Sequence, residues 1–235
     1  MKNTDEQIIS KFKFNSEFVL SNLPDEDLKE IEDNIRYRKY KRNKNIFIEG
    51  NYPSGIFYVK EGKIKKYKNY NEGKEQIIYI CTKGEFFGYS ALLSEEQYTD
   101  SSAALEDSTV GYIPKEIFLK ILNRSPILSL TLLKNLSHEF GVMVNNVVTY
   151  AHRTARERVA LSLILLNDKF KEDSEGKEFV EIVLPREDMA NMVGTALETL
   201  TRLLYDFKDE QLIEIIGRKI IIKDENRLIK TANLF

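Results

Sequence analysis

The stretch Leu184–Asp209, LPREDMANMVGTALETLTRLLYDFKD, constrains the fold of this chain most strongly. Its apolar residues repeat at helical spacing in two runs, which are separated by a glycine turn at Gly194-Thr195. A short helix, a turn and a longer helix form the helix-turn-helix pattern, in which the second helix lies in the DNA major groove. The pattern therefore predicts double-stranded DNA as a partner. The two apolar faces comprise Met189, Met192 and Val193, then Leu200, Leu203, Leu204 and Phe207.

Composition and charge indicate an ordinary soluble globular protein, because 42% of the 235 residues are hydrophobic and 31% are charged. No run reaches the roughly 18 apolar residues of a membrane helix, and the first residues, MKNTDEQIISKF, lack a secretory hydrophobic region. We therefore expect a cytoplasmic protein without a membrane partner. The formal net charge of −2 neither supports nor excludes DNA binding, because DNA binding depends on whether the cations lie together on one face.

Residues that carry catalytic or metal chemistry are few. Cys81 is the only cysteine, which excludes an internal disulfide framework, and His138 and His152 are too few and too far apart to indicate a metal site. The sequence has no phosphate-cradling glycine loop, no GxSxG and no HExxH. It therefore predicts a protein that is not an enzyme and that calls for no cofactor.

The segments before the helix-turn-helix follow one another in a definite order. Residues 16–36 indicate an amphipathic helix after Pro24, because Leu28, Ile31 and Ile35 are spaced three to four apart. From Asn45 to about Ile113, short apolar runs alternate with glycines, which is typical of an antiparallel barrel or roll.

Helical spacing returns after Pro114, and from Leu133 the apolar residues alternate in steps of three and four, as in an a/d seam. Leu132, Val144 and Val148 indicate a second apolar face. Such a helix packs on its own domain with one face and on a partner helix with the other, although burial inside a monomer is the alternative. A helix-turn-helix usually works as a two-fold pair, which favours a homodimer. The predicted seam comprises Leu133, Leu136, Phe140, Met143, Val147 and Tyr150.

The C-terminal third completes the order. Residues 155–170 indicate another strongly apolar helix, and the run QLIEIIGRKIIIKD after the helix-turn-helix indicates two strands joined around Gly217. This hairpin is a wing beside the recognition helix. We predict three parts: a sensor roll with flanking helices over residues 1–125, a dimerisation helix over 126–152 and a winged helix-turn-helix over 153–235.

A glycine-punctuated roll, a long seam helix and a winged helix-turn-helix together resemble the CRP/FNR superfamily of bacterial transcription regulators, over about residues 30–230. The string EGNYPSGIFYVKEGKIKKYKNYNEGKEQIIYICTKGEFFG follows the glycine spacing of that family. The resemblance implies an α+β fold with an N-terminal antiparallel β-roll of the cyclic-nucleotide-binding type. The matching glycines are Gly50, Gly62, Gly73, Gly84 and Gly88.

The roll departs from the cyclic-nucleotide-binding members of this family. Those members place a Glu for the ribose after GEFFG and an Arg for the phosphate about ten residues later, where this chain has Tyr89 and Thr99. No Arg or Lys occurs between Lys83 and Lys115, so a buried phosphate would lack a cationic partner there. We therefore expect no control by cyclic AMP and leave the effector open. The resemblance implies an effector pocket at Gly88, Tyr89, Ser90, Thr99, Ser101 and Ser102.

The sequence also gives little support for iron–sulfur, haem or redox sensing, which are the other kinds of sensing considered for this family. One cysteine cannot hold an iron–sulfur cluster within a subunit, and we interpret both histidines as surface or interface side chains rather than haem ligands. Cys81 lies in the apolar run IIYICTK, where a buried inert thiol is expected, whereas a redox-sensing thiolate would need a cation such as Lys83 nearby.

The recognition helix matches the family pattern, in which a Glu is followed four residues later by an Arg. Glu198 and Arg202 match it on one helical face, where Arg reads guanine and Glu accepts from cytosine. Leu197 stands where the cyclic-AMP receptor subgroup has an Arg, as in the FNR-like subgroup, and it is suited to a thymine methyl. We therefore predict TTGA half-sites in an inverted repeat. The alternative is an ordinary surface pair of Glu198 and Arg202.

Other DNA contacts are expected to be positional. Arg186, Thr199 and Arg218 are the predicted phosphate partners. The basic run RYRKYKRNK, residues 36–44, precedes the roll, and we interpret it as a solvated first strand in preference to a nucleic-acid contact.

The sequence thus predicts a homodimeric DNA-binding transcription regulator that works with RNA polymerase. The alternative is a cyclic-nucleotide-binding regulatory module that acts on a partner protein, which would leave the helix-turn-helix unexplained.

Overall fold

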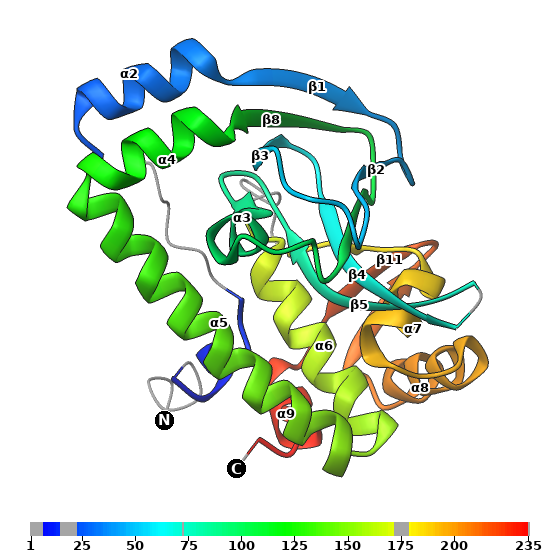
Figure 1. The fold of residues 1–235 in the computed structure, drawn as a ribbon. Coiled ribbons are helices and arrows are strands. Elements are labelled where there is room, and N and C mark those ends of the chain that lie inside the picture. Colours follow the sequence, from blue (N-terminus) through cyan, green and yellow to red (C-terminus); the bar gives the residue numbers. More distant parts are fainter. Residues whose placement is uncertain (1–6, 15–22, 72, 172–178, 235) are drawn as a thin grey trace. The chain divides into compact units, whose positions relative to one another are not determined.

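The computed structural model describes residues 7–14, 23–71, 73–171 and 179–234 (Figure 1). The chain divides into two compact units, Phe14–Phe140 and the combination of Met1–Lys13 with Gly141–Phe235. A long helix, α5, spans Pro126–His152 and contributes residues to both units. The α+β class, the β-roll, the long helix and the winged helix-turn-helix are all confirmed, whereas the three-part division at residues 125 and 152 stays a prediction.

The first unit contains two four-stranded sheets with the orders β1-β8-β3-β6 and β2-β7-β4-β5, and every pair is antiparallel. This is the roll that the glycine-punctuated runs predict. Its strands are β1 (Arg36–Tyr40), β2 (Asn45–Phe47), β3 (Gly55–Glu61), β4 (Ile64–Asn71), β5 (Lys74–Cys81), β6 (Phe86–Phe87), β7 (Ser101–Ala104) and β8 (Ser108–Pro114).

Strand alternation gives the roll two cores, because successive residues of a strand point to opposite faces. On β3, Phe57 and Val59 pack inside the roll, while Ile56 faces the helices. The inner core also contains Phe47, Ile64, Cys81, Phe87 and Val110, and the outer core contains Ile31, Phe86, Ile113, Phe118, Ile121 and Leu128.

Within the described part of the roll unit, the shorter helices are α2 (Asp25–Asn34), α3 (Tyr89–Ser94) and α4 (Lys115–Arg124). Helix α2 confirms the helix predicted after Pro24, and its acidic first turn suits the helix dipole. It ends before Ile35 instead of continuing to residue 36, because Arg36 already pairs with Tyr112 as the first residue of β1. Most of the predicted segment before Pro24, residues 16–22, lies outside the described residues.

The second unit packs helices against a small sheet. It contains α6 (Ala155–Lys169), α7 (Arg186–Val193), α8 (Leu197–Asp209) and α9 (Glu225–Thr231), with the strands β9 (Ile182–Val183), β10 (Ile213–Ile216) and β11 (Lys219–Ile222) in the order β10-β11-β9. Helix α6 and the β10–β11 hairpin confirm the predictions for those segments. The sequence patterns gave no sign of β9 or α9.

Helix α6 starts abruptly because Thr154 caps it. The Thr154 side chain accepts from the Glu157 backbone N–H, and the Glu157 carboxylate accepts from the Thr154 N–H at 2.7 Å. This capping box lowers the pKa of Glu157 and separates α6 from the end of α5.

Candidate DNA interface

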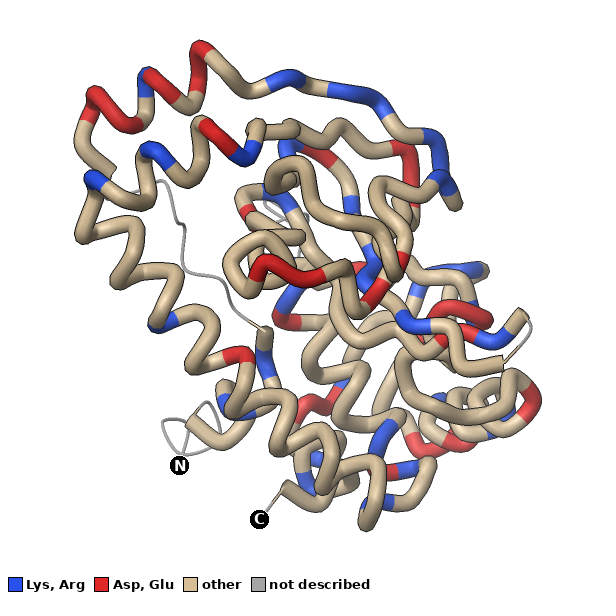
Figure 2. Tube along the Cα trace, in the orientation of Figure 1, with Lys and Arg blue, Asp and Glu red and all other residues tan. Residues whose placement is uncertain are grey.

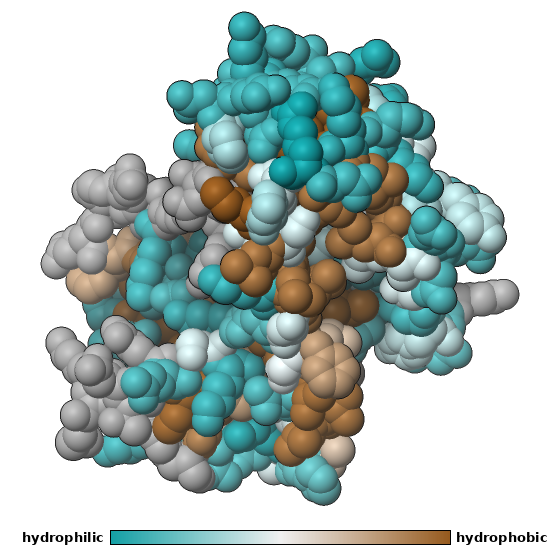
Figure 3. All heavy atoms as spheres, turned by 60° about the vertical axis from the view of Figure 1, so that its left-hand side comes forward, coloured by the Kyte–Doolittle hydropathy of each residue, from teal (hydrophilic) through white to brown (hydrophobic). Residues whose placement is uncertain are grey.

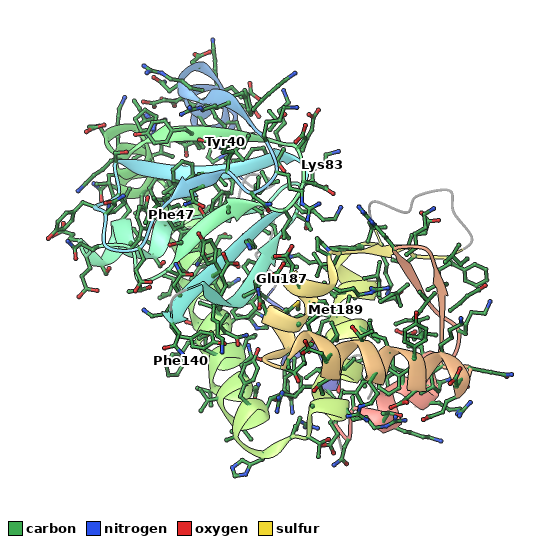
Figure 4. The ribbon with its side chains drawn as sticks, turned by 90° about the vertical axis from the view of Figure 1, so that its right-hand side faces the viewer. Tyr40, Phe47, Lys83, Phe140, Glu187 and Met189 are labelled. Atoms are coloured by element: carbon green, nitrogen blue, oxygen red, sulfur yellow. The ribbon has the colours of Figure 1, made fainter. Side chains whose placement is uncertain are left out.

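The helix-turn-helix is built by α7, a tight turn and α8 (Figure 1). Gly194 ends α7 with a φ of 70°, a left-handed conformation that favours glycine at this position. The predicted apolar faces are buried except at Met192, which is half-buried, and Met189, labelled in Figure 4, has no exposed surface. Leu200 and Phe207 are likewise fully buried on α8. Burial of these side chains determines which face of α8 remains in solvent.

The exposed face of α8 carries the three residues predicted to read bases. Leu197 is the first residue of the helix and is 43% exposed, and Glu198 follows it in an exposed position. The Arg202 side chain is 68% exposed and forms an ion pair with Asp206, one turn further along, at 3.7 Å. Arg202 thus pairs with Asp206. An ordinary surface pair, the alternative interpretation, would instead join Arg202 to Glu198. An exposed pair of this kind is weak enough to exchange for a base edge.

The predicted phosphate contacts occupy three different environments. Arg218 follows Gly217 in the two-residue turn of the β10–β11 hairpin and is exposed at its tip. Thr199 is half-buried on α8. Arg186, the first residue of α7, is also half-buried, and burial lowers the pKa of its guanidinium. Its Nη1 atom is enclosed without a hydrogen-bond partner. Arg218 is therefore the most accessible of the three.

The predicted effector residues differ in their exposure, and their role in a common pocket stays a prediction. Gly88 precedes α3 with a φ of 80°, and Tyr89 and Ser102 are buried in the roll unit, but Ser90 and Thr99 are exposed. Ser101 is also buried, and its Oγ accepts from the Glu49 N–H at 3.0 Å. Of the six positions of the set, four are thus buried and two are exposed.

The roll contains a buried cation that the sequence patterns did not reveal. Lys66 on β4 lies opposite Ser102 on β7, and its Nζ forms an ion pair with Asp100 at 3.1 Å. Both side chains are largely buried, with exposed fractions of 19% and 13%. Burial lowers the pKa of Lys66, but the negative fields of Asp100, Cys81 and Glu139 outweigh burial, and the net pKa is raised. A cation from β4 thus lies beside β7, and it is already paired with Asp100.

Tyr89 joins the same polar region. Its hydroxyl donates to Glu139 Oε1 on α5 at 2.5 Å, and both residues belong to the first unit. Burial and the Glu139 carboxylate raise the pKa of Tyr89 far above its ordinary value. The phenol therefore stays protonated and holds the start of α3 to α5. The position where the family resemblance implied a ribose-binding Glu is occupied by an internal contact.

Helix α5 exposes an unusually apolar face along its length. Leu133 is 61% exposed, Phe140 73% and Val147 66%, and Figure 3 shows hydrophobic side chains gathered over this helix. Of the predicted seam, Met143 and Tyr150 are also exposed, whereas Leu136 is partly buried against the outer core.

The prediction of a second apolar face is wrong for Val144 and Val148. Both are exposed, at 49% and 54%, whereas Leu132 faces the core of its own unit as predicted. An ideal helix advances about 100° per residue, which places Val144 and Val148 about 20° and 60° from Leu133. They therefore widen the exposed stripe instead of forming another one.

The basic segment at residues 36–44 begins with β1, an edge strand of its sheet (Figure 2). Residues 36–39 are exposed, the Arg38 guanidinium lies 5.4 Å from the Tyr40 ring centroid and Lys41 pairs with Asp107. Charged residues on an edge strand discourage pairing with other chains. The interpretation as a solvated first strand agrees with this exposure.

Comparison with known proteins supports both units. Residues 37–125 match the cyclic nucleotide-binding domain family, and residues 157–231 match the Crp-like helix-turn-helix domain family. The fumarate and nitrate reduction regulatory protein of Vibrio cholerae is 25% identical over 213 residues, which cover 90% of this chain and 85% of that protein. The transcriptional activator Anr of Pseudomonas aeruginosa is 27% identical over 208 residues, covering 88% and 85%.

Solved structures show the same fold. FixK2 from Bradyrhizobium japonicum superposes with a TM-score of 0.76 at 21% identity, covering 84% of this chain and 96% of that one. A CRP/FNR-family regulator from Eubacterium rectale superposes with a TM-score of 0.67 at 23% identity, covering 92% and 97%.

The two domains together define a class, the DNA-binding regulators that combine a cyclic-nucleotide-binding type of roll with a helix-turn-helix. Within this class, the chain belongs to the CRP/FNR family of transcription regulators. This membership confirms that it is a DNA-binding protein and not an enzyme. Among the described residues, no helix is both long enough and apolar enough to span a membrane.

Proposed function

We propose that this CRP/FNR-family regulator binds DNA as a homodimer, reads an inverted repeat of TTGA half-sites and requires no cyclic nucleotide. The carrying observation is the exposed face of α8, where Leu197, Glu198 and Arg202 are all accessible while the opposite face is buried. Arg202 reads guanine, Glu198 accepts from cytosine, and Leu197 contacts a thymine methyl. Arg186, Thr199 and Arg218 contact phosphates, and RNA polymerase is the predicted protein partner.

Selection of binding sites from random DNA tests the base-reading assignment. We expect inverted TTGA half-sites with centres about 34 Å apart, one helical turn or a multiple of it. Leu197→Arg should shift the selected half-site toward TGTGA, because an Arg adds a guanine contact at this position. Selection of TGTGA half-sites by the wild-type protein would overturn the assignment.

Dimerisation is supported by the exposed stripe of α5. Contiguous apolar surface of this kind marks protein interfaces, and a parallel pair of such helices would bury Leu133, Phe140 and Val147. Phe140→Glu places a charge in the centre of the stripe, so sedimentation should show a monomer that has lost tight operator binding. Lys134→Glu, an exposed position beside the stripe, is the matched control and should remain dimeric.

Independence from cyclic nucleotides is supported by the interior of the roll. A phosphate near Asp100 and Glu139 would meet two carboxylates, and Lys66, the largely buried cation beside Asp100, already pairs with it. Titration calorimetry with cyclic AMP and cyclic GMP should give no binding heat, and ligand-free protein should shift a TTGA palindrome. Tight nucleotide binding without any DNA shift would instead favour a module that acts on a partner protein.

A further inference from the structure

The turn of the helix-turn-helix is held by side chains that lie outside it. The Arg158 side chain on α6 donates from Nε to the Val193 carbonyl and from Nη2 to the Gly194 carbonyl, both at 3.0 Å. The Tyr150 hydroxyl on α5 donates to the Met192 carbonyl at 2.9 Å. Three successive carbonyls at the end of α7 thus accept from α5 and α6, and all these residues belong to the second unit.

The same guanidinium also reaches the end of α5. Arg158 Nη1 donates to the carbonyl of Arg153 at 2.8 Å, and the Arg153 N–H donates to Thr149 as the last turn of α5 closes. The Arg158 guanidinium lies 5.9 Å from the Tyr150 ring centroid. One side chain therefore links the joint between α5 and α6 to the turn that precedes the recognition helix.

The chemistry of this contact suits a rigid connection. The last carbonyls of a helix have no intrahelical partner, and a cation near them is favourable. A guanidinium is planar and presents its N–H groups in a fixed fork, so three bonds to two segments fix the distance and the angle between them. A lysine ammonium at the same position cannot span the three acceptors with that geometry.

We infer that Arg158, assisted by Tyr150, is a positioning residue that couples the direction of α5 to that of the recognition helix α8. Leu197 begins α8 only three residues after Gly194, so the turn determines where the helix starts. This inference rests on the proposed function, since α5 is the dimer helix there. In a dimer, the coupling sets how strictly the two recognition helices demand one half-site spacing. Tyr150, predicted as a seam residue, acts in this coupling through its hydroxyl.

The test compares DNA-binding affinities of the full chain on three kinds of DNA. These are a TTGA inverted repeat with its preferred spacing, repeats with one base pair added or removed, and a single half-site. For Arg158→Lys we expect the preference for the correct spacing to fall by about tenfold, the size expected from lost charge-assisted hydrogen bonds. Affinity for the single half-site and the melting temperature should change much less.

Arg156→Lys is the matched control, because Arg156 lies one half-turn earlier on α6 and pairs with Glu210 instead of the turn. It should keep the wild-type spacing preference. Tyr150→Phe removes one hydroxyl and should lower the preference in the same direction but less, which gives a second reading if Arg158 variants fold poorly.

An unchanged spacing preference in both Arg158→Lys and Tyr150→Phe would overturn the inference. Equal losses on the single half-site and the full repeat would also overturn it, because they indicate a purely local role in folding. A wild-type protein without any spacing preference would instead overturn the proposed two-fold reading, which separates the two failures.

Discussion

The β-roll and the helix-turn-helix each contain a cation paired with a carboxylate, and the two pairs occupy opposite environments. Lys66 and Asp100 lie 3.1 Å apart with exposed side-chain fractions of 19% and 13%. Arg202 and Asp206 lie 3.7 Å apart with exposed fractions of 68% and 42%. The first pair is largely shielded from solvent, whereas the second is exposed to it. A hydrated cation exchanges partners at little cost, and a desolvated one does not.

The two regions therefore differ in whether their polar groups are accessible to another molecule. The exposed face of α8 presents unburied polar groups that DNA can use. In the roll, the polar side chains instead contact one another within the first unit: Lys66 pairs with Asp100, and Tyr89 donates to Glu139. The recognition surface is thus open to an external partner, while Tyr89, at the position where the family resemblance implied a ribose-binding Glu, is engaged in an internal contact with Glu139.

Removal of Asp100 is expected to give the largest effect. Asp100→Ala leaves Lys66 buried without its carboxylate, which should lower the free energy of unfolding by about 3 kcal/mol, since breaking a buried pair is costly. Denaturant unfolding measures this change. The double variant Lys66→Met with Asp100→Leu is the control and should recover most of the loss, because apolar replacement removes both desolvated charges.

The pair should also show a defined pH dependence. The folded pKa of Lys66 is raised above its ordinary 10.5, so its contribution is fully present below that pH and is lost as the pH rises through the folded pKa. Unfolding measured at increasing alkaline pH should therefore show the wild type losing stability relative to the double variant, which lacks both charges. A difference that is constant through this range would contradict the proposed role of the charge.

Arg202→Ala should have the next largest effect, on binding specificity and not on folding. About 1–3 kcal/mol of discrimination at the guanine position should vanish, the size of one bidentate base contact. Fluorescence anisotropy on the operator and on a guanine-substituted operator measures it. Lys208→Ala, an exposed cation on the same helix, should leave the discrimination intact.

Arg218→Ala at the tip of the wing tests a phosphate contact. The slope of log affinity against log salt should become less steep by about one, and binding should weaken evenly across DNA sequences. Lys230→Ala on α9 removes another exposed charge outside the predicted interface and should leave the slope unchanged. An unaltered slope in Arg218→Ala would exclude the wing tip from the interface.

Asp206→Ala should have the smallest effect and completes the comparison with Asp100. Because its ion pair with Arg202 is exposed, the free energy of unfolding should change by about 0.5 kcal/mol or less. Thermal melts beside those of Asp100→Ala measure the contrast. A loss as large as that of Asp100→Ala would remove the distinction between the two regions.

Sequence patterns predicted the parts of the fold that repeat. The apolar spacing of Leu200, Leu203, Leu204 and Phe207 identified the buried face of α8, and its remaining face identified the candidate base-reading residues. Helix α6, the wing and the roll followed from similar repeats. The two-residue strand β9 was missed because two residues show no periodicity. Val144 and Val148 were assigned to a separate face, although an advance of about 100° per residue places them within about 60° of Leu133.

Contacts between distant segments were beyond such patterns. The alternation GKIKKYK places Lys66 on one side of a strand, but Asp100 becomes its partner only because β4 pairs with β7. The bonds from Arg158 to the turn likewise join residues 35 and 36 positions apart. The spacing of polar residues along the sequence does not indicate which distant residues will become partners.

The burial of Cys81 gives the roll a built-in reporter. It is the only thiol in the chain, and its side chain has no exposed surface at the end of β5. A thiol-reactive dye can label it only when the strand opens, so the labelling rate reports the frequency of local opening. The labelling rate thereby measures the local opening of the inner core without any engineered probe.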